Sequence, residues 1–481
     1  MILWLHGGML ILEREKYNLI YDYYKCHILF GQLHQGDLLP TIEQIGNTYQ
    51  VAPQTVRNAL KKLQRDGLIF VSPGRHTEVI YKTTPNEALR CTQNYYLART
   101  DEIDVVYHIA SLLLTPFFYA GCQRLTDDDL MQILSVCREK GSNIVSISMF
   151  CCEIMLRAVH NQLINTLFSD VVSFFQFPCM ASFNEESSAE YQECYNLTVS
   201  SCEALDRTGL FQAFTGFQAL TQAILLAFIT EAAKTTPKPE QISFHWQTYR
   251  DRPQHCHTLA ARMISGIISG KYWEGDMLPS YENLALELSV SVSTVRRTVS
   301  LLRDMGLIHS MNGVGNRIEF SPPNFEKLQR PTIQKNIAMA RESAEILLVV
   351  VKNKNVVEKE FSKLSDEHIQ KLKQILSEKK NCCVLDTVIL LTDYLMVLYP
   401  LSSFFETFGK LSGFLLLSYP FLLNQWREDG SDKISGTIEV LERALDEKNT
   451  DLFSDSMSAL LQNVLTQIKQ AEKLLHSAKN K

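Results

Sequence analysis

Two segments of the chain carry a stripe of polar side chains at helical spacing. The first stripe combines amides, an arginine and a lysine, and the second combines hydroxyls and arginines: Gln54, Arg57, Asn58 and Lys61, then Ser293, Arg296, Arg297 and Ser300. Side chains of these types can read base edges in a DNA major groove. Lys62 and Arg65 flank the first stripe and suit backbone phosphates. The alternative for either stripe, taken alone, is a solvated helix face.

The opposite side of each segment is apolar, as in a helix that packs against a core. Its predicted members are Val56, Ala59, Leu60 and Leu63 in the first segment, and Val292, Val295, Val299 and Leu302 in the second. We expect the first helix to run from Pro53 to about Asp66, since proline suits the first helical position. Gly67 then ends it.

The neighbouring residues predict the elements that position the first stripe. Residues 16–33 have apolar and aromatic side chains at helical spacing, and residues 42–49 predict a short second helix. Residues 68–72 and 77–81 predict two short strands around Pro73 and Gly74. A helix, a helix-turn-helix and a hairpin in this order describe a winged helix.

The second stripe belongs to an internal copy of the first segment. When the sequence is shifted by 239 residues, 14 of the 44 positions from Gly36 to Val79 are identical. The same shift places Arg124–Leu130 on Lys363–Ile369, and in both a hydroxyl residue precedes acidic ones, as at a helix N-cap. The unbroken register indicates that a whole unit is duplicated.

The predicted fold class is therefore mainly α with small β-wings. Two winged helix-turn-helix domains alternate with two all-α helical-bundle domains, because no useful strand pattern occurs outside the wings. The predicted boundaries are 10–82 and 252–322 for the winged helices, and 90–235 and 335–477 for the helical domains. Proline-rich stretches at Thr235–Pro239 and Ser321–Pro323 indicate linkers.

At these residues the sequence resembles the GntR superfamily of bacterial transcription regulators. That family's pattern is Gly-x-x-Leu-Pro-Ser, then Val-Ser-x-x-Thr-Val-Arg, then Gly-Leu-Ile and a glycine wing. Both copies match it, at Gly36–Thr41, Val51–Arg57, Gly67–Ile69 and Gly74, and at Gly275–Ser280, Val290–Arg296, Gly306–Ile308 and Gly313. With the stripes, the resemblance implies further DNA-contacting residues: Thr41, Thr55, Lys62, Gly74 and Arg75, with Ser280, Thr294 and Gly313.

Both copies also depart from the family pattern. The family usually has an arginine two residues after Leu-Pro-Ser, where this chain has Glu43 and Glu282. A second family arginine, at the start of the stripe-bearing helix, is replaced by Pro53 and Val292. The first copy has nine basic and seven acidic residues over 11–82, and the second has seven of each over 251–322. The departures imply weak or unusually selective DNA binding.

In the first helical domain, the run Ala158–Leu163 and the segment Glu203–Leu205 followed by Ala213 resemble parts of the effector domain of the family's FadR branch, and the second helical domain resembles it more loosely. Many members of that branch hold a divalent metal through an Asp-x-x-x-His pair and two later histidines. The positions of that pair are Ser148 and Cys152 in the first copy, and Thr387 and Leu391 in the second. Because neither copy keeps the ligands, we expect no metal and no other cofactor. The aromatic residues of the first helical domain predict a core, with an apolar ligand cavity as the alternative.

Composition narrows the class of protein further. Of 481 residues, 46% are hydrophobic and 21% charged, as in a globular chain, and the net charge is −6. Twelve cysteines with no CxxC spacing are typical of a reducing cytosol. We expect Cys151, Cys152, Cys382 and Cys383 to be small buried hydrophobes, with redox sensing as the alternative. No unbroken apolar run reaches the roughly 18 residues of a membrane span, and no signal peptide is evident.

These features predict a cytoplasmic, sequence-specific transcription regulator that binds a double-stranded DNA operator. One chain would act as a pseudo-dimer, with a small-molecule effector in the helical domains and no membrane partner. Further homodimerisation remains open. The alternative is a non-enzymatic interaction protein whose winged helices bind protein instead of DNA. An enzyme is not expected, because the sequence has no phosphate-binding loop, nucleophile elbow or metal-ligand spacing.

Overall fold

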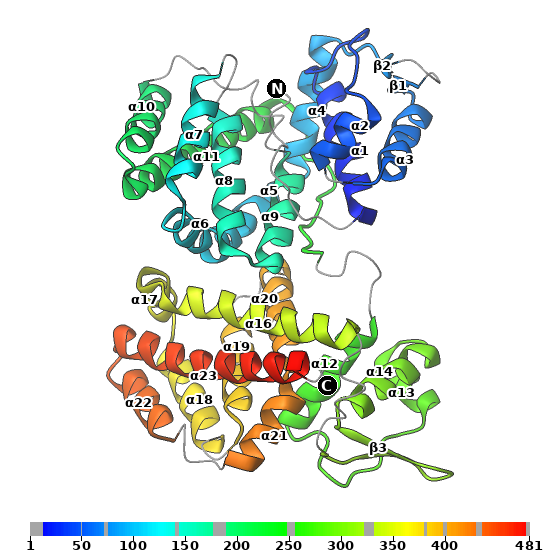
Figure 1. Cartoon of the computed structure of the whole chain (residues 1–481), viewed down its shortest axis with the longest axis vertical. Helices are drawn as coiled ribbons and strands as arrows, with labels where there is room; N and C mark the ends of the chain where they lie inside the picture. Colours follow the sequence, from blue (N-terminus) through cyan, green and yellow to red (C-terminus); the bar gives the residue numbers. More distant parts are fainter. Residues whose placement is uncertain are drawn as a thin grey trace. The chain divides into compact units, whose positions relative to one another are not determined.

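The computed structural model divides the chain into two compact units, Met1–Asp251 and Arg252–Lys481 (Figure 1). It describes residues 13–49, 51–71, 76–139, 144–176, 189–247, 255–321, 331–379, 382–397, 402–429 and 435–477. Each unit begins with a winged helix and continues into a helical domain. The only sheets in the described residues are two antiparallel two-stranded hairpins, one in each winged helix.

The first winged-helix domain has the predicted order of elements. They are α1 (Glu13–Leu29), α2 (Ile42–Tyr49), α3 (Pro53–Arg65), β1 (Ile69–Phe70) and β2 (Glu78–Val79). The prediction for α2 is confirmed at both ends, and α3 begins at Pro53 as expected. The strands are shorter than predicted, because only the pairs Ile69–Val79 and Phe70–Glu78 form a ladder.

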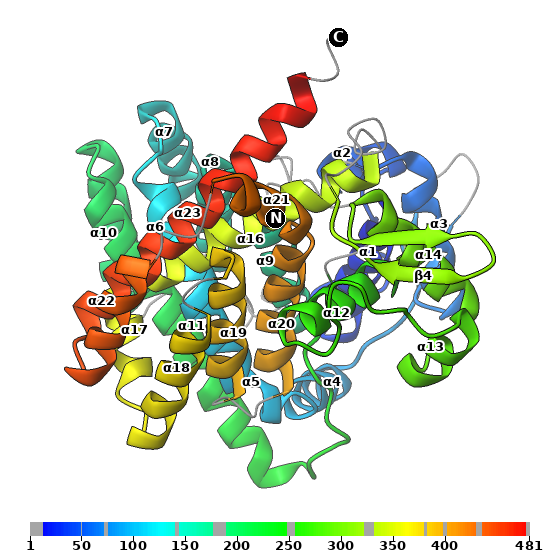
Figure 2. The same ribbon diagram turned by 90° about the horizontal axis from the view of Figure 1, so that it is seen from below.

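The second winged-helix domain repeats this arrangement. Its elements are α12 (His255–Ile268), α13 (Tyr281–Leu288), α14 (Val292–Asp304), β3 (Ile308–Met311) and β4 (Gly315–Ile318). Figure 2 shows the β3–β4 hairpin beside α14. The backbone agrees in detail with the first copy: Gly36 N–H donates to the Val79 carbonyl at 2.9 Å, and Gly275 N–H to the Ile318 carbonyl at 2.8 Å. The duplication therefore extends to individual hydrogen bonds.

Glycines in the left-handed region fix two turns in each copy. Gly67 and Gly306 follow α3 and α14 with φ of 73° and 83°, and Gly36 and Gly275 have φ of 93° and 100°. Residues with a β-carbon rarely adopt this conformation. The turns explain why these glycines occur at the same place in both copies.

The first helical domain contains eight α-helices in its described residues. They are α4 (Pro85–Leu97), α5 (Thr100–Ile109), α6 (Thr115–Cys122), α7 (Asp127–Arg138), α8 (Ile144–Val159), α9 (Gln162–Phe175), α10 (Ala189–Glu203) and α11 (Arg207–Thr235). A π-helical turn over Ala110–Leu114 joins α5 to α6. The predicted N-cap is confirmed: Thr126 and Asp129 form a capping box at the start of α7.

The second helical domain has α16 (Pro331–Lys352), α17 (Lys354–Phe361), α18 (Asp366–Glu378), α19 (Val384–Val397), α20 (Ser402–Leu416), α21 (Tyr419–Asp429), α22 (Ser435–Asp446) and α23 (Thr450–Ser477). α18, α19, α20 and α23 lie at the positions of α7, α8, α9 and α11 after the 239-residue shift. The cap is repeated too, since the Ser365 hydroxyl accepts a hydrogen bond from the His368 N–H. The predicted fold class is confirmed.

The chain after α11 is not a free linker, although Thr235–Pro239 predicts one. Residues 236–247 run back along their own unit and bury the rings of Phe244 and Trp246, which are 2% and 1% exposed. Trp246 Nε1 donates to Thr166 Oγ1 at 3.1 Å, and the Gln247 N–H donates to Asp170 Oδ2 at 2.7 Å. This segment is therefore part of the first unit's core.

Within the part of the chain that the structure describes, two helical stretches are long and apolar enough, by length and composition alone, to cross a membrane. They are Thr100–Cys122 and Arg207–Thr235, and 56% and 28% of their tested windows are buried. Neither stretch is an unbroken apolar run: uncharged glutamine and threonine interrupt α11 without adding charge. Thr100–Cys122 contributes the buried side chains Leu112, Leu113 and Phe117 to the first helical domain.

Candidate nucleic-acid interface

Helix α3 presents one polar and one apolar face, as predicted. Val56, Ala59, Leu60 and Leu63 are its buried side chains, and they lie in the core of the first winged-helix domain. On the opposite face Gln54, Arg57, Asn58 and Lys61 are exposed, while Thr55 and Lys62 are half-buried. The packing of the apolar face therefore turns the polar stripe toward solvent, where a DNA groove can reach it.

Hydrogen bonds and ring contacts order part of this face. Gln54 Nε2 donates to Asn58 Oδ1 at 3.0 Å, so the two amides are paired across one helical turn. The Lys62 ammonium lies 3.7 Å from the centre of the Tyr21 ring on α1. The Tyr21 hydroxyl in turn donates to Asp66 Oδ2 at 2.5 Å. Burial is the main cause that raises the pKa of Tyr21, and this hydrogen bond is the second. The ring that orders Lys62 therefore belongs to α1, and the polar stripe of α3 did not predict this contact.

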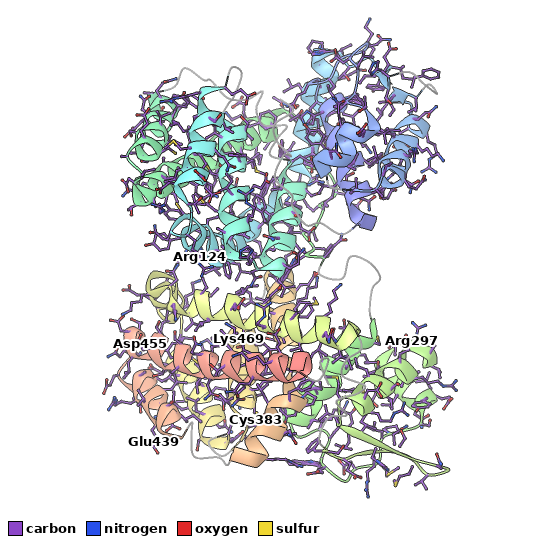
Figure 3. The ribbon with its side chains drawn as sticks, viewed as in Figure 1. Arg124, Arg297, Cys383, Glu439, Asp455 and Lys469 are labelled. Atoms are coloured by element: carbon purple, nitrogen blue, oxygen red, sulfur yellow. The ribbon has the colours of Figure 1, made fainter. Side chains whose placement is uncertain are left out.

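Helix α14 also has a buried apolar face and an exposed polar face, but its polar side chains are of different types. Arg296 and Arg297 are exposed, and Figure 3 labels Arg297 on α14. Ser293 Oγ lies 2.9 Å from Ser291 Oγ, and Thr294 Oγ1 lies 2.8 Å from the same hydroxyl, which also caps the helix. Ser300 Oγ accepts a hydrogen bond from Arg303 Nη2 at 3.2 Å. The hydroxyls of this stripe are thus already hydrogen-bonded, and the arginines are its most available groups.

The apolar face of α14 differs from the prediction in one position. Val295, Val299 and Leu302 are buried, but Val292 is only half-buried. Val292 is the first residue of the helix, so its side chain lies at the edge of the core. Thr298 is fully buried instead, and its hydroxyl donates to the Thr294 carbonyl at 3.0 Å.

Thr41 and Ser280 lie at the start of the first helix of each helix-turn-helix. The Thr41 hydroxyl accepts a hydrogen bond from the Gln44 N–H, and the Ser280 hydroxyl accepts one from the Asn283 N–H, both at 3.2 Å. Both residues are exposed. A hydroxyl that accepts from the backbone keeps its own proton to donate, and a helix N-terminus favours an anion. The position suits a backbone phosphate.

The structure describes the whole of the second wing but only part of the first. Gly313 lies at the exposed tip of the β3–β4 hairpin with φ of 72°, and a β-carbon there would meet nothing within 4 Å. This leaves room for close approach by another backbone. Gly74 and Arg75, predicted for the same role in the first wing, lie outside the described residues. Glu43 and Glu282, which replace family arginines, are both exposed.

The other predicted sites have these environments. Among the described residues no group of three or more His, Cys, Asp or Glu side chains could hold a metal ion. Cys151, Cys152 and Cys383 are buried, as predicted, and Cys382 is half-buried. Burial raises the pKa of the Cys151 and Cys152 thiols, which lowers the thiolate fraction that oxidation needs.

Comparison with known proteins points to one family. Residues 16–79 and 257–318 each match the gntR family of bacterial regulatory proteins. No curated protein matches the sequence. These two matched segments are the two winged-helix domains described above.

Similar solved structures include E. coli McbR/YncC, at 14% identity and a TM-score of 0.23, over 45% of this chain and 98% of that one. Streptococcus agalactiae GntR has 19% identity and a TM-score of 0.18, over 44% and 99%. A structure titled "Lar controls the expression of the Listeria monocytogenes agr system and mediates virulence" has 13% identity and a TM-score of 0.19, over 44% and 96%. Likeness at such low scores says nothing of this chain's function. From the two family matches, the chain carries two winged-helix domains of the gntR family of bacterial regulatory proteins, in tandem.

Proposed function

We propose that this protein is a sequence-specific, DNA-binding transcription regulator that acts in the cytoplasm and has no enzymatic activity. The observation that supports this most is the exposed polar face of α3 and of α14. Each is held outward by a buried apolar face, and Arg57 and Arg296 occupy the same exposed position in the two copies. Arginine at a base edge favours guanine through two hydrogen bonds.

We propose further that one chain acts as a pseudo-dimer on its operator. A regulator built from two identical subunits presents two identical reading helices and tends to bind a palindrome. Here Gln54, Asn58 and Lys61 correspond to Ser293, Arg297 and Ser300. The two halves of the operator should therefore differ in sequence. Association of the two helical domains with each other would set the spacing of the half-sites.

A small-molecule effector in the second helical domain is part of the same proposal. Asp386 Oδ1 and Thr387 Oγ1 on α19 are buried without a hydrogen-bond partner in the described residues. Burial also raises the pKa of Asp386 to about 7. Buried polar atoms without a partner are rare in folded proteins, and a polar ligand would satisfy them. An effector bound there would act on DNA binding only if it favours one domain arrangement over another.

A second function is favoured by the surface of α13. Glu282 is exposed where the family has an arginine, and Leu286 on the same helix is 80% exposed. An acidic group would repel phosphates, and an exposed leucine would gain from burial against a protein partner. On this alternative the second winged helix binds a protein partner.

Salt dependence of binding to mixed genomic DNA tests the proposal. If the intact chain contacts phosphates through its arginines and lysines, the logarithm of its affinity falls linearly with the logarithm of salt concentration, by about 0.9 per phosphate contact. Binding that is absent at low salt, or that does not change with salt, would contradict the proposal and favour the protein-binding alternative.

A further inference from the structure

The first winged-helix domain has a surface pocket between α1 and α3. Its lining side chains are Tyr17 from α1, with Asn58, Lys61, Lys62 and Arg65 from α3. The pocket has a volume of about 470 Å³ and opens to solvent. That volume lies within the usual range of about 300–1,000 Å³ for small-molecule sites. Three of the five side chains carry a positive charge, and no carboxylate is among the described side chains that line the pocket.

The charge of Lys62 is held in place before any ligand arrives. Its ammonium lies 3.7 Å from the centre of the Tyr21 ring and 5.7 Å from that of Tyr17. Tyr21 is itself held, since its hydroxyl donates to Asp66 and accepts from Lys25 Nζ at 3.2 Å. Lys62 is half-buried, while Lys61 and Arg65 are exposed. A charge ordered by aromatic contacts loses less conformational freedom when it binds an anion.

Among the described side chains, the acidic groups near the pocket do not line it. The Asp66 carboxylate accepts a hydrogen bond from the Tyr21 hydroxyl. Asp22 on α1 interacts electrostatically with Lys62 but does not line the pocket. An anion in the pocket would therefore meet Lys61, Lys62 and Arg65 directly.

The second winged-helix domain cannot form the same pocket. A shift of 239 residues replaces the five lining residues by Cys256, Arg297, Ser300, Leu301 and Asp304. Asp304, at the place of Arg65, is 3% exposed and thus buried. Ser300 and Leu301 thus stand where the first copy has its two lysines, and the acidic Asp304 stands where it has Arg65. The pocket is a property of the first copy.

We propose that this pocket binds a phosphate group. The Arg65 guanidinium presents paired N–H donors that match phosphate oxygens, and the lysines supply compact charges. The Asn58 amide and the Tyr17 hydroxyl are neutral donors among the lining side chains. The phosphate belongs either to the DNA backbone, in which case the inference rests on the proposed function, or to a free phosphorylated small molecule.

Calorimetric titration of the full-length chain with inorganic pyrophosphate, at constant ionic strength, tests the pocket. The double variant Lys61→Ala/Arg65→Ala changes only exposed side chains and should bind pyrophosphate at least tenfold more weakly. Lys62→Met keeps a chain of similar length over Tyr21 and removes the charge, and it should weaken binding in the same way. The matched control is Arg303→Ala, which removes an exposed cation from α14 where no such pocket exists, and it should change nothing.

Salt dependence of DNA binding by the same proteins separates the two sources of phosphate. If the occupant is a backbone phosphate, the double variant lowers the salt slope by about 0.9 for each DNA phosphate that it no longer neutralises. If the occupant is a free phosphorylated molecule, saturating pyrophosphate leaves the DNA affinity of the wild-type chain unchanged at constant ionic strength, whereas pyrophosphate competes with DNA if the occupant is a backbone phosphate. Either outcome supports the pocket.

Pyrophosphate that fails to bind the wild-type chain, or that binds the double variant as tightly, would overturn the inference. A loss of equal size in Arg303→Ala would overturn it too, because that result means general attraction between charges. Failure of the proposed function is a distinct result: the chain would not bind DNA at any salt concentration, while pyrophosphate still bound the wild type and not the double variant.

Discussion

Gln54 and Asn58 face each other across one turn of α3, and the Gln54 amide donates to the Asn58 carbonyl oxygen at 3.0 Å. The bond holds the Asn58 amide in one orientation on the exposed face. An amide held in this way can offer both a donor and an acceptor to a single adenine, which is the pairing that a carboxamide favours in the major groove. The pair therefore presents an ordered contact in place of two independent mobile side chains.

Replacing Gln54 with Ala should weaken binding to the preferred DNA site. The variant removes a direct base contact and no longer orients Asn58, so we expect a loss of about 1–3 kcal/mol of binding free energy, or roughly 5- to 150-fold in affinity. Electrophoretic or fluorescence titration measures it. Gln64→Ala is the control, because Gln64 is an exposed amide of α3 outside the stripe. An equal loss of affinity in the control, or none in Gln54→Ala, would argue against base reading by this face.

Trp246→Ala should strongly destabilise the first unit. The indole is 1% exposed and its N–H donates to Thr166 Oγ1, so the change leaves a cavity and removes this hydrogen bond. Large aromatic truncations of this kind cost about 3–5 kcal/mol. Urea unfolding measures the loss of stability. Trp273→Ala is the control, because Trp273 is 67% exposed and should change stability little. Similar stabilities of the two variants would mean that residues 236–247 are not packed as described.

The first unit should lose stability below about pH 6.5 because of His27. Its ring is 3% exposed, and burial lowers its pKa from 6.5 to about 4. Between these values the unfolded chain binds the proton and the folded chain does not, so stability is complete above pH 6.5 and falls as the pH decreases toward 4. The loss by pH 4 is of the order of 3 kcal/mol, from about 1.4 kcal/mol per unit of pKa.

Urea unfolding of wild type and His27→Phe, each at pH 7.5 and pH 5, measures this effect. Phenylalanine keeps an aromatic ring beside Tyr23, which lies 4.1 Å from the His27 ring between centres. The comparison is within each protein, so a change in overall stability does not affect it. The variant should lose part of the pH dependence, and the exposed His34→Phe should keep it. A variant with the full wild-type dependence would show that His27 is not its source.

Local signals in the sequence predict most of the winged helices. Proline at position 53 and glycines at 67 and 306 act within one turn of their own residue, so the start of α3 and the ends of α3 and α14 follow from nearby residues. The buried face of α3 follows from periodicity alone. Both copies carry these signals, which is why the repeat predicts the fold class.

Contacts between distant segments could not be predicted in this way. Lys62 meets Tyr21, 41 residues earlier, only because α1 packs across α3 at a particular angle. Trp246 reaches Thr166 from 80 residues away, and its proline-rich approach is typical of a linker. The hydroxyls of Ser293 and Thr294 look available in the sequence, yet Ser291 engages both. Spacing indicates which face a side chain occupies but not which partner it meets.

The most direct test of two unlike DNA readers in one chain is selection of the preferred site from random double-stranded DNA. The chain should enrich a site with two half-sites that differ in sequence. Repeating the selection with Asn58→Arg should change one half, and with Arg297→Asn the other, because these residues correspond after the 239-residue shift. A palindromic preferred site, a site that neither variant changes, or no enrichment at all would contradict the account.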